Sequence, residues 1–559
     1  MKISEIKYTR PDVESLKKVY NELTEAFSKE GVTAEEQAEI YRKLNKIDED
    51  VSTMASLAYV RFTLNTNDEF YVGEMDFYNE AEPVLTGLKT VFAEAMLKSP
   101  HRKYLEEVFS PLIFVNYEIL KKSYDPIIEE ECVEENKLQT EYKRLLSSAK
   151  IPFNGEILNI SQLGKYKDSP DREVRRLAFN AHGEFMKENG DKFDDIYDRM
   201  VKVRHKMALK MGYKNYVELG YYRMGRNCYS PDDIAKFRDQ LIKDWVPFVC
   251  EIKKQLANEL GIDKIMLYDD NIYIKEGNPQ PIGTAEEIFA NGKKMYEEMS
   301  SETGEFIRFM LEHDLFDVIA REGKSNGGYC TELPSYKMPF IFANFDGTSG
   351  DIDVLTHEAG HALAAYKAMN SDIPSELRQG GMETCEVHSM SMEFFAWKWM
   401  DLFFGDKAND YRRMHLLNAI TFLPYGTMVD YFQQKVYEEP DMTPADRKAL
   451  WLELEGMFRP YLSNEGITYM EEGGRWQYQS HIYERPFYYI DYCLAQTIAF
   501  DFLIKSKEDY SKAFNDYDNF LKAGGSKTFV ELVKTAGFKL PFECGTLAEI
   551  IKDLKKIVG

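Results

Sequence analysis

The chain has 559 residues, of which 44% are hydrophobic, 14% are aromatic and 29% are charged. This length is enough for one large domain or a few closely packed ones with an ample core, and the aromatic content argues against a disordered chain. The 94 acidic residues outnumber the 70 basic ones, and the formal net charge of -24 would repel a phosphate backbone. We therefore expect no nucleic-acid partner.

The 34 glycines and 20 prolines are fewer than in an average protein of this length, which favours a helix-rich fold. The seven cysteines are odd in number, widely spaced and free of Cys-x-x-Cys pairs, which indicates reduced thiols. The chain begins with a charged segment that lacks an apolar signal core, and no apolar run approaches the ~18 residues of a membrane span. We expect a cytoplasmic protein without a membrane partner.

The first third of the chain predicts successive helices. Thr33 followed by Glu36 matches a capping box at a helix start. Residues 169–173 predict another start, with a proline near the first helical position and acidic residues in the first turn, and this helical stretch breaks near Gly190. Residues 229–233 repeat the same signals. These helices are rich in charge, and we assign no chemistry to them.

The pattern changes between residues 323 and 350. Glycines gather at 323–328, and the short aromatic segment 338–345 ends at the turn-forming pair Asp346 and Gly347. This pattern predicts a strand or hairpin. The segment lies directly before the most informative part of the sequence.

His357, Glu358 and His361 form a His-Glu-x-x-His motif within a stretch of small and apolar residues. On a helix, positions i and i+4 share one face, so two imidazoles can bind one zinc ion at ~2.0–2.1 Å. Glu358 can then take a proton from a zinc-bound water and deliver it to a leaving amine. Asp353, one turn earlier, can accept the second ring N–H of a ligand histidine or favour the helix N-terminus. The alternative is a buried helix with two incidental histidines.

A catalytic zinc needs a third protein ligand, and the next segment offers four groups. They are Glu383, Glu386, His388 and Glu393. Glu386 and Glu393 are seven residues apart and share a helix face. Spacing alone does not choose among the four. The metzincin extension His-x-x-Gly-x-x-His is absent, which excludes that class of peptidase.

Three segments in order resemble the thimet oligopeptidase family of zinc metallopeptidases, and most closely its oligoendopeptidase F and Pz-peptidase branch. They are residues 353–361, 386–393 and 476–492. The resemblance implies that Glu386 is the third zinc ligand and that Glu393 orients a ligand from behind. It also implies a mostly helical, two-lobed body around a deep channel that admits short unfolded peptides. A strand beside the zinc helix could pair with the backbone of such a peptide.

The third segment carries candidates for stabilising the oxyanion of peptide hydrolysis. His481 and the tyrosines near residue 490 can donate N–H and O–H hydrogen bonds to the negative charge that forms on the carbonyl oxygen. We expect His481, Tyr489 and Tyr492 in this role. The spacing differs by about one residue from the thimet oligopeptidase branch, so the choice among Tyr488, Tyr489 and Tyr492 stays open. An ordinary aromatic core helix is the alternative.

We therefore predict a mainly α-helical protein with a small β element near the zinc helix. An N-terminal helical lobe covers residues 1–200, and a catalytic lobe covers residues 201–559 and shares its core. The predicted function is a zinc metalloendopeptidase with one Zn²⁺ ion that hydrolyses short peptides, as a monomer or small homo-oligomer. One alternative is a zinc carboxypeptidase, for which the sequence identifies no cationic group to capture a C-terminus. Another is a catalytically silent peptide-binding protein, against which the intact Glu358 argues.

Overall fold

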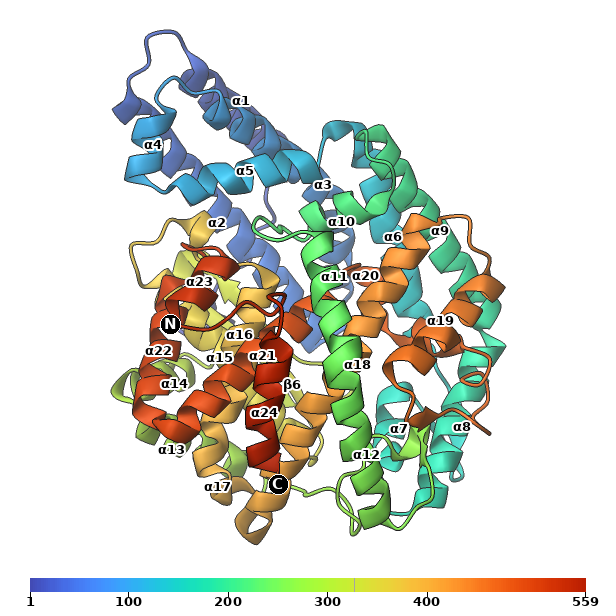
Figure 1. Ribbon diagram of the computed structural model, residues 1–559. Helices are drawn as coiled ribbons and strands as arrows, with labels where there is room; N and C mark the ends of the chain where they lie inside the picture. The colour runs from blue at the N-terminus through green and yellow to red at the C-terminus, as the bar shows by residue number, and fades with distance from the viewer. Residues whose placement is uncertain (326, 559) are drawn as a thin grey trace.

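The computed structural model describes residues 1–325 and 327–558, and most of them are helical (Figure 1). The mainly α-helical fold predicted from the sequence is confirmed. The first five helices form an extension, coloured blue in Figure 1, with a hydrophobic cluster of its own to which Leu377 contributes from much later in the chain. These helices are α1 (Val13–Ser28), α2 (Ala34–Leu64), α3 (Glu69–Leu97), α4 (Arg102–Val108) and α5 (Pro111–Ser123).

The predicted helix starts are present, with one shift. Thr33 caps α2, and its side chain forms the expected capping box with Glu36. Ser230 caps α11 (Pro231–Gln240) in the same way. At the remaining start the cap is Asp171, whose carboxylate accepts two backbone N–H groups of the first turn, so the preceding proline lies outside the helix. The predicted break near residue 190 is at Asn189, between α8 (Arg172–Glu188) and α9 (Gly190–Lys210).

The other helices build the body of the molecule below and beside this extension (Figure 1). The first group contains α6 (Glu129–Ser147), α7 (Ile160–Lys167), α8 (Arg172–Glu188), α9 (Gly190–Lys210), α10 (Tyr216–Arg223), α12 (Val246–Leu260), α13 (Ala285–Met299) and α14 (Ser301–Glu312). The second contains α15 (Gly350–Met369), α16 (Met382–Phe395), α17 (Asp401–Phe404), α18 (Ala408–Glu438), α19 (Pro444–Phe458), α20 (Ser480–Glu484), α21 (Tyr489–Glu508), α22 (Tyr510–Ala523), α23 (Phe529–Thr535) and α24 (Thr546–Val558).

Within the described residues, the β structure is limited to three small sheets. The sheet beside α15 has the order β4-β6-β5, built from β4 (Phe316–Ile319), β5 (Tyr329–Leu333) and β6 (Met338–Phe345). The strands β5 and β6 are antiparallel, and Tyr329 pairs with Phe342 and Leu333 with Met338, which confirms the predicted strand and hairpin. The strand β5 is an edge strand with β6 as its neighbour. The other two sheets pair β1 (Ile151–Phe153) with β2 (Glu156–Leu158), and β3 (Ile265–Met266) with β7 (Leu462–Ser463).

One hydrophobic core extends through the body, from Ile6 to Leu554. At its centre α16 packs against both α15 and α21, and α18 packs against α21. The helices α15, α16 and α21 carry most of the candidate residues of the sequence analysis, and His481 lies on α20. The site is therefore embedded in the core. Residue 200, the approximate lobe boundary in our prediction, lies inside α9. The division into two lobes there stays a prediction.

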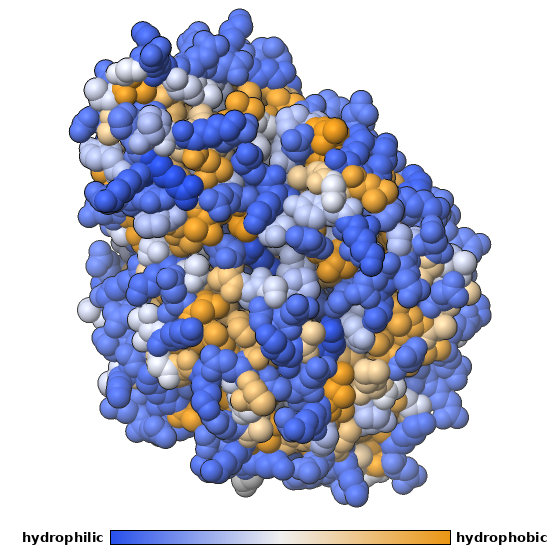
Figure 2. Space-filling model, turned by 45° about the horizontal axis from the view of Figure 1, so that its top comes forward, coloured by the Kyte–Doolittle hydropathy of each residue, from blue (hydrophilic) through white to orange (hydrophobic). Residues whose placement is uncertain are grey.

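The surface is mainly hydrophilic on the face shown in Figure 2, where apolar atoms lie in separate patches. Among the described residues, none of the helices has both the length and the apolar character needed to span a bilayer. All seven cysteines lie in the described part of the chain and are free thiols there.

Candidate metal centre and active site

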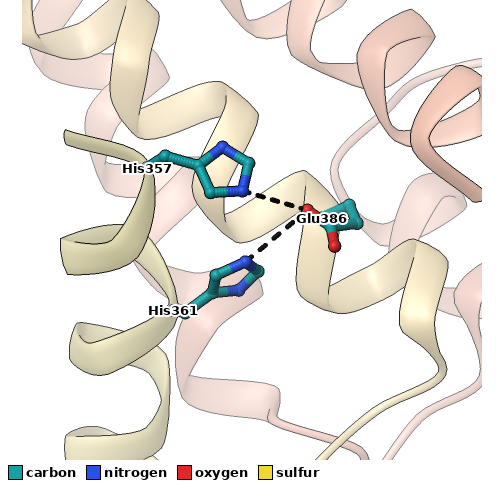
Figure 3. A group of neighbouring side chains, drawn as sticks. All are labelled: His357, His361 and Glu386. Atoms are coloured by element: carbon teal, nitrogen blue, oxygen red, sulfur yellow. Dashed lines mark ion pairs between the residues drawn. The ribbon is translucent and has the colours of Figure 1, made fainter. Parts of the chain in front are cut away.

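Two helices bring three predicted ligands together. His357 and His361 lie one turn apart on α15 and face Glu386 of α16 (Figure 3). Glu386 Oε2 is 3.3 Å from His357 Nε2 and 3.5 Å from His361 Nε2, and one ligand atom of each residue lies within 4.8 Å of the others. Ligand atoms around a tetrahedral zinc with bonds of ~2.0–2.1 Å are separated by about 3.4 Å. The donor set and its spacing therefore fit a zinc ion.

Gly360 explains why the two helices can approach so closely. A Cβ atom at this position would lie 2.6 Å from the backbone oxygen of His388 and 2.7 Å from Cα of Ser389, both on α16. Such contacts are shorter than atoms tolerate, so a larger residue would push α15 and α16 apart. The glycine between the two histidines is thus a requirement of the site, and sequence reasoning missed it.

Glu386 is held in position as a carboxylate. Burial alone would raise its pKa, but the neighbouring His361 and His357 lower it well below the usual range. Ser389 donates a hydrogen bond to Oε2 at 3.0 Å, and Tyr488 donates one to Oε1 at 2.5 Å. Both oxygens are therefore engaged, and Oε2 is the one directed at the histidines.

Behind the ligands, the Glu393 carboxylate connects two histidines. Its Oε1 is 2.6 Å from His357 Nδ1, and its Oε2 is 2.7 Å from His415 Nε2. His415 in turn accepts a hydrogen bond from the indole N–H of Trp397 at 3.2 Å. A carboxylate on the second ring nitrogen leaves His357 Nε2 free as a ligand atom and increases its basicity. The sequence shows no partner for His415, because twenty-two residues separate it from Glu393.

Asp353 does not take the alternative position weighed for it beside the ligand histidine. Its carboxylate accepts a hydrogen bond from the Tyr411 hydroxyl, and the Nδ1 atom of His357 is already bound to Glu393. Asp353 does lie one helical turn before His357, but the neighbouring helix α16 supplies the carboxylate that binds the ring nitrogen.

Two of the four residues that competed for the place of third ligand lie away from the histidine Nε2 atoms. Glu383 faces the Tyr229 hydroxyl at 3.3 Å, and Glu393 lies behind His357.

A cavity of about 720 Å³ opens in front of the three ligands. Glu358 lines it together with His357, His361 and Glu386. Burial raises the pKa of Glu358, which favours its action as a base near neutral pH. The edge strand β5 also lines the cavity, and so do residues of the N-terminal helices α2 and α3. The site therefore lies at the bottom of a recess between the extension and the body.

The tyrosines divide between two cavities. Tyr488 and Tyr492 line the cavity of the metal ligands, whereas Tyr489 lines a second cavity of about 350 Å³ behind Tyr492. His481 lies in this second cavity, and Tyr492 borders both. The ring of Tyr489 packs 5.7 Å from that of Phe422, away from the ligands. Tyr488 and Tyr492 thus share a cavity with the predicted ligands, and Tyr489 does not. The role of Tyr489 in stabilising the oxyanion stays a prediction.

The protonation of His481 follows from its neighbours. Tyr425 donates to the side-chain oxygen of Gln479 at 2.8 Å, which directs the amide NH₂ of Gln479 at His481 Nδ1, 2.9 Å away. Nδ1 therefore accepts, and the ring proton lies on Nε2. Burial lowers the pKa of His481 to about 4, and the charge of Arg485 acts in the same direction. His481 is a neutral donor through Nε2, and sequence reasoning missed Gln479 and Tyr425.

A kink in the backbone sets the direction of the tyrosines. Phe487 has φ +68°, a left-handed conformation that is uncommon for a bulky residue. Its backbone N–H donates to Gln433 Oε1 at 3.1 Å, and its carbonyl accepts from Arg226. Its ring fills the space next to Gly220. Residues far away in the sequence thus hold the strained turn that begins α21.

Comparisons with known proteins agree with this geometry. Residues 3–124 match the Peptidase M3 N-terminal domain, and residues 165–550 match Peptidase family M3. Oligopeptidase PepF of Bacillus subtilis (strain 168) is 21% identical over 575 residues, covering 94% of this chain and 82% of that protein. A solved structure of PZ peptidase A with an inhibitor is 47% identical with a TM-score of 0.96, covering 100% of this chain and 99% of that chain. A second solved structure, described as oligoendopeptidase F, is 46% identical with a TM-score of 0.96, covering 100% and 98%. The resemblance seen in the sequence is confirmed, and the chain belongs to peptidase family M3.

Proposed function

We propose that this peptidase is a zinc-dependent metalloendopeptidase that hydrolyses short unfolded oligopeptides. The observation that carries the proposal is the convergence of two imidazole nitrogens and one carboxylate oxygen beside Glu358, inside a cavity. Two histidines and a glutamate are a common ligand set of catalytic zinc, which keeps one position open. His357, His361 and Glu386 would hold the ion. When bound, zinc lowers the pKa of a water molecule and polarises the substrate carbonyl.

Glu358 is the proton carrier in this proposal. It follows His357 directly on α15, lines the same cavity, and makes no hydrogen bond through its side chain to a described residue. Its carboxylate can therefore accept a proton from the attacking water. Because burial raises its pKa, it can hold that proton and pass it to the nitrogen of the leaving amine.

Tyr492 and His481 are the proposed donors to the developing oxyanion. Burial and the nearby Glu386 carboxylate raise the pKa of Tyr492, so its hydroxyl stays protonated. His481 is neutral and offers the Nε2–H group. Neutral donors aimed at a site of developing negative charge stabilise the transition state. Tyr488 acts by positioning Glu386, to whose Oε1 it donates.

The cavity supports a peptide in an extended conformation as substrate. Among the strands of the described residues, β5 is an edge strand that pairs only with β6, and it lines the cavity over Tyr329, Cys330, Thr331 and Glu332. An edge strand can bind an extended backbone through main-chain hydrogen bonds without reading its sequence. The helices α2 and α3 border the same cavity, which limits access to short and unfolded chains.

The test uses an end-blocked, internally quenched peptide of about ten residues, a length that a recessed site can accept. The protein is assayed as purified, after chelation, and after zinc is added back, and the products are identified by mass. We expect internal cleavage that chelation abolishes and zinc restores. Removal of residues only from an unblocked C-terminus would favour the zinc carboxypeptidase. Bound zinc without any cleavage would favour the silent peptide-binding protein.

A further inference from the structure

The cavity in front of the metal ligands has a strongly acidic lining. Carboxylates around it include Asp48, Glu49, Glu332 and Glu376, in addition to the proposed ligand and base. A substrate carboxylate that enters this space meets several like charges, which repel it in a partly enclosed cavity. A cation in the lining would therefore decide whether such a group can bind.

Two of the three lysine and arginine side chains that line this cavity are already paired. Lys89 lies 3.4 Å from the carboxylate of Asp48, and Arg378 lies 2.7 Å from that of Glu49. The third, Arg485, forms no ion pair or side-chain hydrogen bond with residues 1–325 or 327–558. Its guanidinium thus keeps all its donors available.

Arg485 is also close to the proposed chemistry. It is the C-cap residue of α20, the short helix that carries His481. Its guanidinium carbon lies 5.9 Å from the ring centroid of Tyr488, whose hydroxyl is 2.5 Å from Glu386 Oε1. The arginine is therefore at most about three residues of extended peptide from Glu386, at ~3.3–3.6 Å for each residue.

We propose that Arg485 is a specificity-determining residue that binds a carboxylate of the peptide substrate, about three residues or fewer from the scissile bond. The fork of the guanidinium can take a carboxylate through two parallel hydrogen bonds. The C-terminal carboxylate and an acidic side chain present the same chemistry. This inference rests on the proposed endopeptidase function and names the class of peptide that the site prefers.

The test compares three N-acetylated peptides of about six residues, a length within reach of both groups. One has a free C-terminus and neutral side chains, the second is its C-terminal amide, and the third is an amide with glutamate as the final residue. Each is assayed with the wild-type protein, Arg485→Met, Arg485→Lys and Lys89→Met. Lys89→Met is the matched control, because it removes the same charge from the same cavity but takes it from an existing pair.

We expect kcat/KM of the wild-type protein to be about 10-fold higher for a peptide with a carboxylate than for the neutral amide, as for a hydrogen bond to a charged group. Preference for the first peptide would identify the C-terminal carboxylate, and preference for the third an acidic side chain. Arg485→Met should abolish the preference, Arg485→Lys should keep part of it, and Lys89→Met should retain it. Equal values for the three peptides, or an unchanged preference in Arg485→Met, would overturn the assignment.

Measurements of peptide binding test the role of Arg485 separately from the proposed endopeptidase function on which this inference rests. The affinities of the same peptides are measured by isothermal titration calorimetry in a Glu358→Gln background, with and without Arg485→Met. If no peptide is hydrolysed by the wild-type protein, the endopeptidase proposal fails, while tighter binding of the carboxylate peptides that depends on Arg485 still supports the arginine. Equal binding of all three peptides would overturn its role independently of catalysis.

Discussion

The metal side and the tyrosine side of the site are built in different ways. On the metal side, the Glu393 carboxylate holds His357 and His415 at 2.6 and 2.7 Å, in a buried and charged network. On the tyrosine side, the rings of His481 and Tyr492 meet at a centroid distance of 5.9 Å. Hydrogen bonds to charged groups fix geometry more strongly than ring contacts do. The difference teaches that the proposed ligands are set before substrate arrives, whereas the proposed oxyanion donors can still adjust.

The largest effect should follow from removing a ligand on the metal side. We expect Glu386→Ala to lose bound zinc and all measurable cleavage, because two histidines alone leave the ion under-coordinated. Glu383→Gln is the matched control, three residues earlier on α16 and directed at Tyr229 instead. Metal analysis after dialysis, together with the cleavage rate, checks the prediction. A Glu386→Ala protein that keeps a full complement of zinc would contradict the ligand assignment.

The tyrosine side should show a large but smaller effect at one position. We expect Tyr492→Phe to reduce kcat by about 10²–10³-fold with little change in KM, as for loss of one oxyanion donor. Tyr489→Phe should stay close to the wild-type rate, because the Tyr489 ring packs against Phe422. Steady-state kinetics of the two variants decide between them. A loss in Tyr489→Phe as severe as in Tyr492→Phe would restore Tyr489 as the donor.

The carboxylate behind the ligands should tune the metal site without being essential. Glu393→Gln removes the charge that supports His357, and we expect a 10- to 100-fold lower zinc affinity, which is typical of such outer partners. Activity should return at saturating zinc. Asp353→Asn serves as the control, because its partner is Tyr411. Zinc titrations against a competing chelator measure the zinc affinity of both variants. Equal affinities for Glu393→Gln and the wild-type protein would exclude the supporting role of Glu393.

The smallest effect should come from the group that fixes the tautomer of His481. Gln479→Leu removes the donor to Nδ1, so a neutral imidazole can place its proton on either nitrogen, and we expect a rate loss of roughly twofold to tenfold. Tyr425→Phe should act in the same direction, since it frees the Gln479 amide. The nitrogen chemical shifts of His481 report the tautomer directly. An unchanged Nε2–H signature in Gln479→Leu would show that another group sets it.

The metal helix was predictable because its information is local. The helical repeat alone places His357 and His361 on one face. Residues 338–345 have an aromatic composition and are followed by a turn, and both features predict a strand. The sequence near the motif does not identify the proposed third ligand. Glu386 and Glu393 share a face of α16, and only the close approach at Gly360 decides that Glu386 meets the histidines while Glu393 lies behind one of them.

The tyrosines could not be assigned from the sequence for a related reason. A strained φ at Phe487 begins the helix that carries them, and Arg226 and Gln433 hold this turn from distant parts of the chain. The spacing from His481 to the tyrosines is uncertain by about one residue. In the folded chain, adjacent residues such as Tyr488 and Tyr489 line different cavities, so this uncertainty decides which cavity the chosen tyrosine faces. The tautomer relay and the unpaired Arg485 likewise depend on contacts that exist only in the folded chain.

The central claim is that Glu358 carries the proton in peptide hydrolysis and is not one of the metal ligands. Glu358→Gln keeps the shape of the side chain but removes its ability to accept a proton. The most direct measurement is the zinc content and the internal cleavage rate of this variant, made on the same preparation. We predict a normal zinc content and a rate reduced by about 10²–10⁴-fold, the usual contribution of general acid–base catalysis. A Glu358→Gln protein that binds zinc and cleaves at the wild-type rate would contradict the account.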